Sequence, residues 1–212
     1  MSFALNPFVS FGTQSGGGGG GGSAGTGRIT VANSGALYTS VNLAMADGHN
    51  VIAVIGETTE NNSIFAPNPG LTLTIDPGAN LNIGSGYFDF NANDLDINGA
   101  GYITYNHLSS GLILFRSANN SKLSIESITI NNNSAIPTCL TNAEFATFSS
   151  VKFVGVLKLC ANGNILDGCV FDGNTIFIDN TSSNTVIDSS ILRNVLVSDS
   201  GVNTLLSDCV VY

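Results

Sequence analysis

The sequence predicts a parallel β-helix, a fold in which short strands wind into coils and each coil lies on the one before it. Three observations predict it: an apolar triplet that returns about every 20 residues through the C-terminal half, small polar runs between short strands, and a composition that favours strands and turns. The copies of the triplet are Ile125, Ile128 and Ile130; Phe148, Val151 and Phe153; Leu166, Cys169 and Phe171; Ile187, Ser190 and Leu192; and Leu206, Cys209 and Val211. A unit of this length cannot bury its apolar side alone, so it must stack on its neighbour.

A second strand follows the first after roughly ten residues in several copies of the repeat. These strands are expected at Val156 to Leu159, Ile176 to Ile178 and Val195 to Val197. Gly, Asn and Asp tolerate left-handed backbone angles, so the polar runs Asp172-Gly173-Asn174 and Arg193-Asn194 are expected to be corners.

The composition limits the domain count and the partners. The chain has 212 residues, 43% hydrophobic and 10% charged, which is enough for one core and one domain. Six Lys and Arg residues stand against 15 Asp and Glu residues, for a net charge of -9. So few cations cannot form a phosphate-binding groove, and neither nucleic acid nor a membrane surface is an expected partner. No apolar run approaches the roughly 18 residues that span a bilayer.

Residues 1–27 are expected to form an extended apolar arm and a glycine tether, and residues 28–212 the β-helix domain. The arm residues expected to anchor a partner are Phe3, Leu5, Pro7, Phe8, Val9 and Phe11. A secretory signal would begin with positive charge and continue into an uninterrupted apolar core, so no secretion signal is expected here. The glycines from Gly16 to Gly22 are typical of a flexible tether. Ordering such a tract is costly in entropy, so a fixed position would require both ends to be held.

The first part of the expected domain has a recognisable order of elements. A strand at Ile29 to Val31 precedes a short helix at Ala36 to Ala46, which Asp47-Gly48 would end. Strands at Val51 to Thr58 and Leu71 to Ile75 follow. One face of the expected helix holds Leu37, Val41, Ala44 and Met45.

This order resembles the opening of right-handed β-helices of the pectin-lyase-like superfamily, and Ser121 to Asn132 is similar to the degenerate repeats of that group. The resemblance covers roughly Ile29 to Tyr212. The expected fold class is therefore all-β: a single-stranded right-handed parallel β-helix with a short N-terminal capping helix and an extended N-terminal arm. Lyases, hydrolases, adhesins and viral spike proteins share this fold, so the fold alone does not give the function.

The resemblance implies two kinds of catalytic site to look for, acidic calcium clusters with a basic residue in lyases and paired aspartates with His, Arg and Lys in hydrolases. Asp94 and Asp96 flank Leu95 on one outward face and are weak candidates for a cation site or an acid/base pair. His49 and His107 are single histidines and are interpreted as turn residues. No catalytic constellation is found, so neither enzyme activity nor a cofactor or metal is expected.

Asp167 and Asp188 each follow the first apolar residue of their triplet and are expected to stack, whereas Asp208 lies one place further along. Stacked carboxylates repel each other unless a cation or hydrogen-bond donors separate them. They are interpreted as solvated outward side chains, with a surface cation site as the alternative.

The four cysteines have a structural interpretation. Cys169 and Cys209 occupy the same core position two coils apart, about 10 Å at about 4.8 Å per coil, which is beyond disulfide reach. Cys139 and Cys160 can lie in adjacent coils, where a bridge is sterically possible. Free thiols are the preferred interpretation, because no C-x-x-C pair or His partner accompanies them.

Three functions fit these features. The first is a virion structural protein, such as a capsid decoration, spike or fibre component, anchored by its arm to a capsid or tail protein and located on the particle. The resemblance implies a homotrimer, and Leu206, Val210 and Tyr212 of the last coil are expected to contact another copy, since an open strand edge invites association. The alternative is a polysaccharide-degrading or glycan-binding tailspike-type β-helix that touches a host surface glycan. A bacterial surface adhesin is the third.

Overall fold

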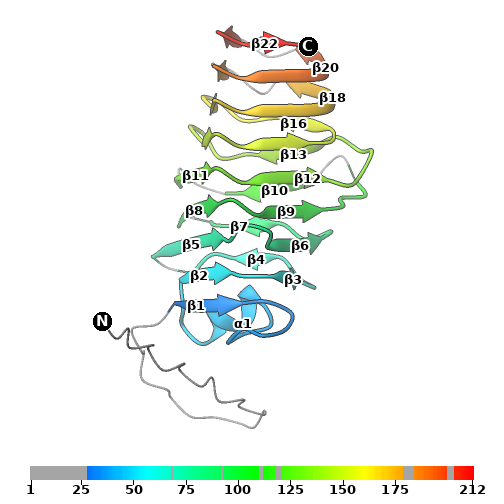
Figure 1. Ribbon diagram of the computed structural model, residues 1–212. Coiled ribbons are helices and arrows are strands. Elements are labelled where there is room, and N and C mark those ends of the chain that lie inside the picture. Colours follow the sequence, from blue (N-terminus) through cyan, green and yellow to red (C-terminus); the bar gives the residue numbers. More distant parts are fainter. Residues whose placement is uncertain are drawn as a thin grey trace, which may run out of the picture.

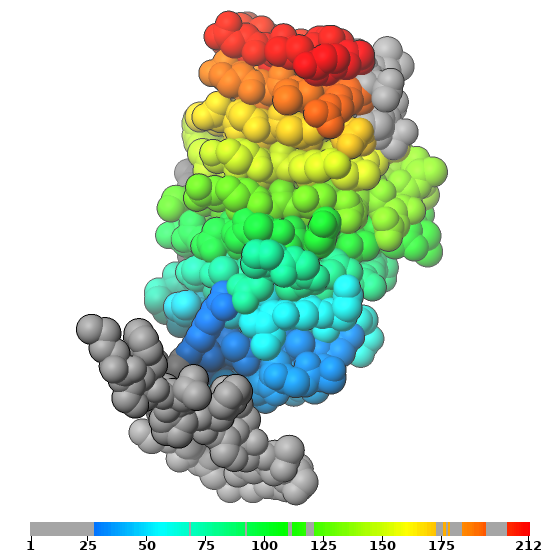
Figure 2. Space-filling model, in the orientation of Figure 1, coloured from blue at the N-terminus to red at the C-terminus, as the bar shows by residue number. Residues whose placement is uncertain are grey.

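The computed structural model describes residues 28–67, 69–91, 93–109, 112–117, 121–178, 184–199 and 203–212. Their strands form two sheets, one of nine and one of thirteen strands, in which the paired strands run parallel. Successive coils lie on one another along a single axis, and the space-filling view shows them as consecutive bands (Figures 1 and 2). The right-handed parallel β-helix expected from the sequence is confirmed.

Strands of the nine-stranded sheet come once per coil. They are β1 (Ile29–Val31), β2 (Val51–Val54), β5 (Gly70–Ile75), β8 (Asp94–Gly99), β11 (Leu123–Glu126), β14 (Thr147–Ser149), β17 (Ile165–Asp167), β19 (Val186–Asp188) and β21 (Leu205–Ser207). Along the order β1-β2-β5-β8-β11-β14-β17-β19-β21, each strand bonds to the strand of the coil before it and the coil after it.

The thirteen-stranded sheet has two branches that join at one long strand. One branch contains β3 (Glu57–Thr59), β6 (Asn80–Gly84), β9 (Tyr102–Tyr105), β12 (Thr129–Asn132) and β15 (Lys152–Val154). The other contains β4 (Ile64–Phe65), β7 (Phe88–Asp89), β10 (Ile113–Arg116), β13 (Thr138–Thr141) and β16 (Leu157–Leu159). Both branches pair with β18 (Val170–Ile178), which is followed by β20 (Ile191–Asp199) and β22 (Val210–Val211).

This junction corrects the expected corners of the last coils. Asp172-Gly173-Asn174 and Arg193-Asn194 do not turn, because they lie inside the continuous strands β18 and β20. The side chain of Asp172 pairs with Lys152 of the coil below, Oδ2 to Nζ 2.9 Å, and its backbone stays in the ladder opposite Arg193. Separate second strands persist only below this level, as β16 shows.

The first four copies of the triplet lie in the core, as predicted, whereas Leu206 and Val211 of the last copy are exposed. Ile125, Phe148, Leu166 and Ile187 are in register on consecutive strands of the nine-stranded sheet, and all are buried. The rings of Phe153 and Phe171 stack in the same way on β15 and β18. Apolar side chains of equivalent repeat positions therefore pack on one another along the axis of the coil stack. The core of the domain consists of these contacts between neighbouring coils.

A stack of left-handed residues joins the two sheets. Positive φ values, between 49° and 61°, occur directly after the strands of the nine-stranded sheet. The residues are Ser127, Ser150, Gly168, Ser189 and Asp208. Each N–H of the first four donates to the next coil, for example Gly168 N to Asp188 O at 3.1 Å. We call these five residues the corner stack; one left-handed residue there turns the chain from one sheet into the next.

The helix α1 (Val41–Ala46) lies at the N-terminal end of the stack, next to β1 (Figure 1). Val41 and Ala44 are fully buried against the first strands. The helix is shorter than expected, and Leu37 precedes it and is 67% exposed. Tyr38 explains the difference, because its backbone exchanges hydrogen bonds with Thr30 and Ala32 and is held in a bridge to Val31.

Within the described ranges, none of the helices has the length and apolar character needed to cross a membrane.

Candidate assembly surfaces

The six predicted anchoring residues of the arm all lie outside the described residues. They are Phe3, Leu5, Pro7, Phe8, Val9 and Phe11. The described chain begins at Arg28, directly after the glycine-rich segment.

The predicted contact residues of the last coil are all exposed. Leu206, Val210 and Tyr212 have 47%, 49% and 74% of their surface accessible. Leu206 continues the interior column above Ile187, whereas Val210 pairs with Ile191 and therefore lies on the outward column. Val211, 68% exposed, continues the interior column above Leu192 and was missed. The triplet itself contains the signal for Val211, since it is the third member of the last copy.

The outward face of the nine-stranded sheet carries two columns of residues in register. One column reads Val51, Thr72, Asp96, Ser124, Thr147, Ile165, Val186 and Leu205. The neighbouring column reads Ala53, Thr74, Asn98, Glu126, Ser149, Asp167, Asp188 and Ser207. The stacking of Asp167 on Asp188 and the displacement of Asp208 are confirmed, because Ser207 occupies the place opposite Asp188.

The outward face of the thirteen-stranded sheet also has a regular column. It reads Asn80, Tyr102, Thr129, Lys152, Val170, Ile191 and Val210. Beside it, Val154, Asp172 and Arg193 are in register. The ammonium of Lys152, which is hydrogen-bonded to Asp172, lowers the pKa of the Asp172 carboxyl, and Arg193 contributes in the same direction.

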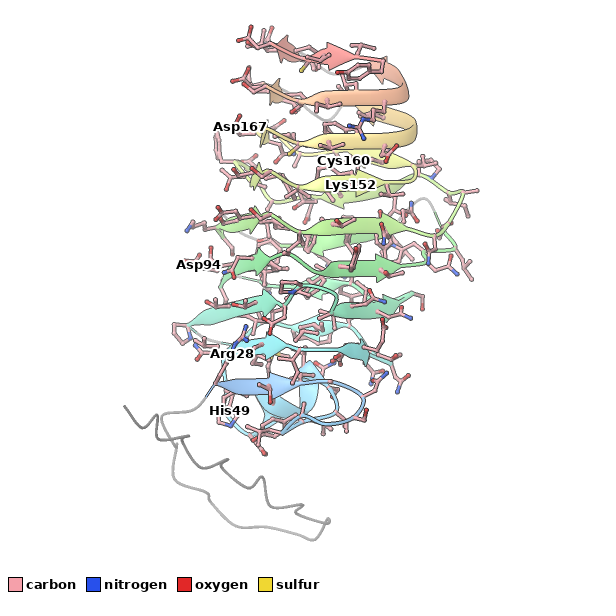
Figure 3. All side chains as sticks on the ribbon, viewed as in Figure 1. Arg28, His49, Asp94, Lys152, Cys160 and Asp167 are labelled. Carbon is pink, nitrogen blue, oxygen red and sulfur yellow. The ribbon has the colours of Figure 1, made fainter. Side chains whose placement is uncertain are left out.

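A hollow of about 290 Å³ lies at the N-terminal end, next to the point where the described chain begins. Its polar lining consists of Arg28, His49, Asn50 and Thr74. Arg28 binds both carboxylate oxygens of Asp76, Nη1 to Oδ2 at 2.8 Å, and this pairing raises the pKa of the guanidinium. Figure 3 shows Arg28 and His49 close together at this end of the stack.

His49 of the hollow belongs to a small hydrogen-bonded group. Its Nε2 lies 3.0 Å from the hydroxyl of Tyr38, and the two rings meet edge to face. Loss of solvent and a hydrogen bond to Asp47 raise the pKa of the Tyr38 hydroxyl. The interpretation of His49 as a turn residue omitted this contact, which joins positions on either side of α1 and has no signature in the sequence.

His107 lies in the irregular segment just after β9, as expected, and its burial was not part of the sequence-based interpretation. Its ring is fully buried at the end of β9, with Nε2 2.6 Å from the carbonyl oxygen of Gly86. It meets Tyr105 edge to face. Burial lowers the pKa of the imidazole, so the neutral ring is favoured.

The weak cation candidates Asp94 and Asp96 share the outward face of β8, as expected. Asp94 accepts a hydrogen bond from the backbone N–H of Lys122, Oδ1 to N 3.1 Å, and the ammonium of Lys122 lies 3.4 Å from Asp96 Oδ1. The cationic partner of Asp96 is therefore a side chain of the next coil. Across the described part of the chain, no group of three or more His, Cys, Asp or Glu residues is gathered as a metal site would require.

All four cysteines are free. Cys139 of β13 and Cys160, just after β16, lie in adjacent coils, and their thiols are hydrogen-bonded to each other. This contact and burial raise the pKa of Cys139. Cys169 is a buried core residue, as predicted, and desolvation raises the pKa of its thiol to about 12.

Comparison with family models, with curated proteins and with solved structures found no match to this chain. The residues and their geometry are therefore the basis for any assignment of function.

Proposed function

We propose that this chain is a structural protein of a virus particle, a capsid decoration, spike or fibre component that projects its β-helix and assembles as a homotrimer. The observation that carries the proposal is the joining of an apolar arm, through a glycine-rich segment, to a domain made of one continuous coil stack. Such a stack is stiff along its axis, since each coil is bonded to the next by parallel ladders. The arm would supply the anchor to a capsid or tail protein.

The exposed surface of the domain supports a structural role. A structural protein needs exposed surfaces that associate, and the last coils expose Leu205, Leu206 and Tyr212. Both histidines have partners of a structural kind: the buried ring of His107 contacts the carbonyl oxygen of Gly86, and His49 contacts the hydroxyl of Tyr38.

The proposal is tested by deleting residues 1–11 and following the chain into assembled particles. We expect a folded β-helix that no longer joins the particle, because the apolar arm is missing. A matched variant that replaces Phe3, Phe8 and Phe11 with Ser keeps the length of the arm and should fail in the same way. Normal incorporation of either chain, measured by quantitative mass spectrometry of purified particles, would exclude the arm as the anchor.

The hollow at Arg28 and His49 favours a second candidate function, binding or degradation of a glycan. Arg28, Asn50 and Thr74 offer hydrogen-bonding groups around a concave surface, and small-molecule sites combine few polar groups with a recess. The test is calorimetric titration of acidic and neutral oligosaccharides, with an assay for new reducing or unsaturated sugar ends. Binding that is lost in His49→Ala and retained in the distant control His107→Gln would support it. No heat with any of the sugars would remove it.

A further inference from the structure

We propose that the last coils carry two different outward faces that bind each other between copies of this chain, the face of the nine-stranded sheet in one copy against the face of the thirteen-stranded sheet in the next. The acidic face is defined as Ile165, Val186, Leu205, Glu126, Asp167 and Asp188. The basic face is defined as Val170, Ile191, Val210, Lys152 and Arg193. This inference rests on the proposed homotrimer and names the surfaces that form it.

The acidic face departs from the pattern of its own sheet. From Thr72 through Asp96 to Thr147 the outward residues of the same column are polar, and only Val51 at its lower end is apolar. At Ile165 the column becomes apolar and remains so, although Ile165 is 43% and Leu205 53% exposed. Outward β-branched and leucine side chains in consecutive coils form a continuous apolar stripe, and such stripes mark sites of association.

The carboxylates beside this stripe have no cationic partner within the described chain. Glu126, Asp167 and Asp188 form no ion pair with a described residue. Asp167 and Asp188 are directly opposite each other on adjacent coils, where their charges repel. A cationic group from outside would relieve this repulsion.

The basic face shows the same change of character at the same height. Its lower residues Asn80, Tyr102, Thr129 and Lys152 each carry a polar group, and the column becomes fully apolar at Val170, Ile191 and Val210. Lys152 and Arg193 lie on either side of Asp172, which neutralises one of the two cations. The face is left with an excess of positive charge, opposite in sign to the acidic face.

The two faces are unlike each other, and this determines the kind of symmetry. An acidic face against a second acidic face would bring Asp167 and Asp188 toward the same carboxylates, which Coulomb repulsion disfavours. A contact between unlike faces is head-to-tail, and it gives a ring, as in the proposed trimer, when the rotation between successive copies closes after three copies. The corner stack, with Ser150, Gly168 and Ser189, lies between the faces, so its small side chains would approach the rotation axis.

The test exchanges the charges of the faces and measures the molar mass of the purified full chain by light scattering. We expect three times the 21.8 kDa of one chain for the unmodified protein. The variant Asp167→Lys/Asp188→Lys and the variant Lys152→Glu/Arg193→Glu should each be monomeric, because each places like charges together. Combining all four substitutions in one chain should restore the trimer, since the faces are then complementary again.

Two further variants separate loss of the contact from loss of the fold. Glu57→Lys/Asp94→Lys changes the net charge as much as Asp167→Lys/Asp188→Lys but lies outside both faces, and it should remain trimeric. Ile165→Thr/Leu205→Thr returns the column to the residue type found at Thr72 and Thr147, so the fold should be kept, as checked by circular dichroism, while association weakens at least tenfold.

Each outcome bears on one claim. A monomeric unmodified protein, a trimer that survives either charge reversal, or a fourfold variant that stays monomeric overturns the assignment of the faces. Because these measurements use purified protein, a trimer that is not incorporated into particles would instead contradict the virion role and leave the faces standing.

Discussion

The ring of Phe171 lies on the ring of Phe153 in the coil below, with centroids 5.2 Å apart and planes inclined by 15°. Both side chains are buried, and Phe148 meets Phe153 edge to face at 5.9 Å. The aromatic core of the C-terminal half is therefore a column rather than a cluster, and its energy is shared between consecutive coils.

Truncating this column should be costly. We expect Phe171→Ala to lower the free energy of unfolding by about 3–5 kcal/mol, because a large buried side chain is removed and its neighbours are fixed by the ladders. Phe65→Ala is the control, as Phe65 is 57% exposed and should cost well under half as much. Denaturant unfolding followed by circular dichroism measures both. If both variants lost the same free energy of unfolding, the stacked rings would contribute no more to stability than an exposed phenylalanine.

Gly99 and Gly35 form a matched pair for backbone geometry. Both have positive φ, 130° and 77°, but a Cβ on Gly99 would collide with the backbone of Ile75, whereas a Cβ on Gly35 would meet nothing within 4 Å. Gly35→Ala should cost about 1 kcal/mol from backbone strain alone. Gly99→Ala should cost about 3 kcal/mol or more, since the strand pair β5 and β8 must separate. Thermal unfolding of the two variants would refute this if their midpoints agreed.

Glu60 should give the protein an unusual dependence on pH. Its carboxylate accepts hydrogen bonds from the N–H of Val41 and from Asn42 Nδ2, but burial is the larger effect and raises its pKa from the usual 4.5. A raised pKa means that the folded state holds the proton more tightly, so this residue's contribution to stability decreases as the pH rises from 4.5 through the raised value.

The measurement is the difference in stability between the unmodified protein and Glu60→Gln at several pH values. We expect the unmodified protein to lose stability relative to Glu60→Gln as the pH rises through that window. A difference that is constant with pH would show that the Glu60 carboxyl does not titrate differently in the folded and unfolded chain.

His107 should have the opposite slope in a different window. Burial lowers the pKa of the imidazole below its usual 6.5. The folded state therefore resists protonation, and stability should fall as the pH drops below 6.5 toward the lowered value. Replacing His107 with Gln should remove this part of the pH dependence, whereas His49→Gln should not. An unchanged profile in His107→Gln would contradict the role of the buried ring.

Cys169 and Cys209 should differ in reactivity although they hold equivalent positions in their repeats. The thiol of Cys169 is buried and has its pKa raised to about 12, so it is almost entirely protonated at pH 8. Cys209 is only partly buried. Iodoacetamide labelling with peptide mass spectrometry should modify Cys209 first and Cys169 only after unfolding. The reverse order would be inconsistent with this packing.

The fold was predictable because the spacing of the core positions within the repeat is regular. The spacing from Ile125 to Ile128 and then to Ile130 gave the core positions, and the same spacing at Leu166 gave the expected place of Cys169. Two adjacent polar or glycine residues within each triplet also mark the left-handed corner, as Asp188 and Ser189 show, but the sequence-based prediction placed the corners at the Gly and Asn runs between the strands instead.

The surfaces could be predicted only in part. Exposure of Leu206, Val210 and Tyr212 follows from their place in the last copy of the repeat. The hollow at His49 depends on how the chain around α1 closes on β1 and β2, and the change of character at Ile165 becomes visible only when the register of the sheet is known. The strand ladders determine which residues of adjacent coils become neighbours. Because the loops differ in length, this pairing cannot be read from the spacing of the residues in the sequence.

The ladders between consecutive coils also determine how this molecule responds to mechanical load. Each strand bonds to the level below and the level above, so tension along the axis is shared at every level by the hydrogen bonds of both sheets at once. Separating two coils under axial tension requires all hydrogen bonds between them to break together. Peeling a single strand from the end of the stack breaks its hydrogen bonds one after another. A rod of this kind should resist axial pull far better than it resists unzipping from its tip.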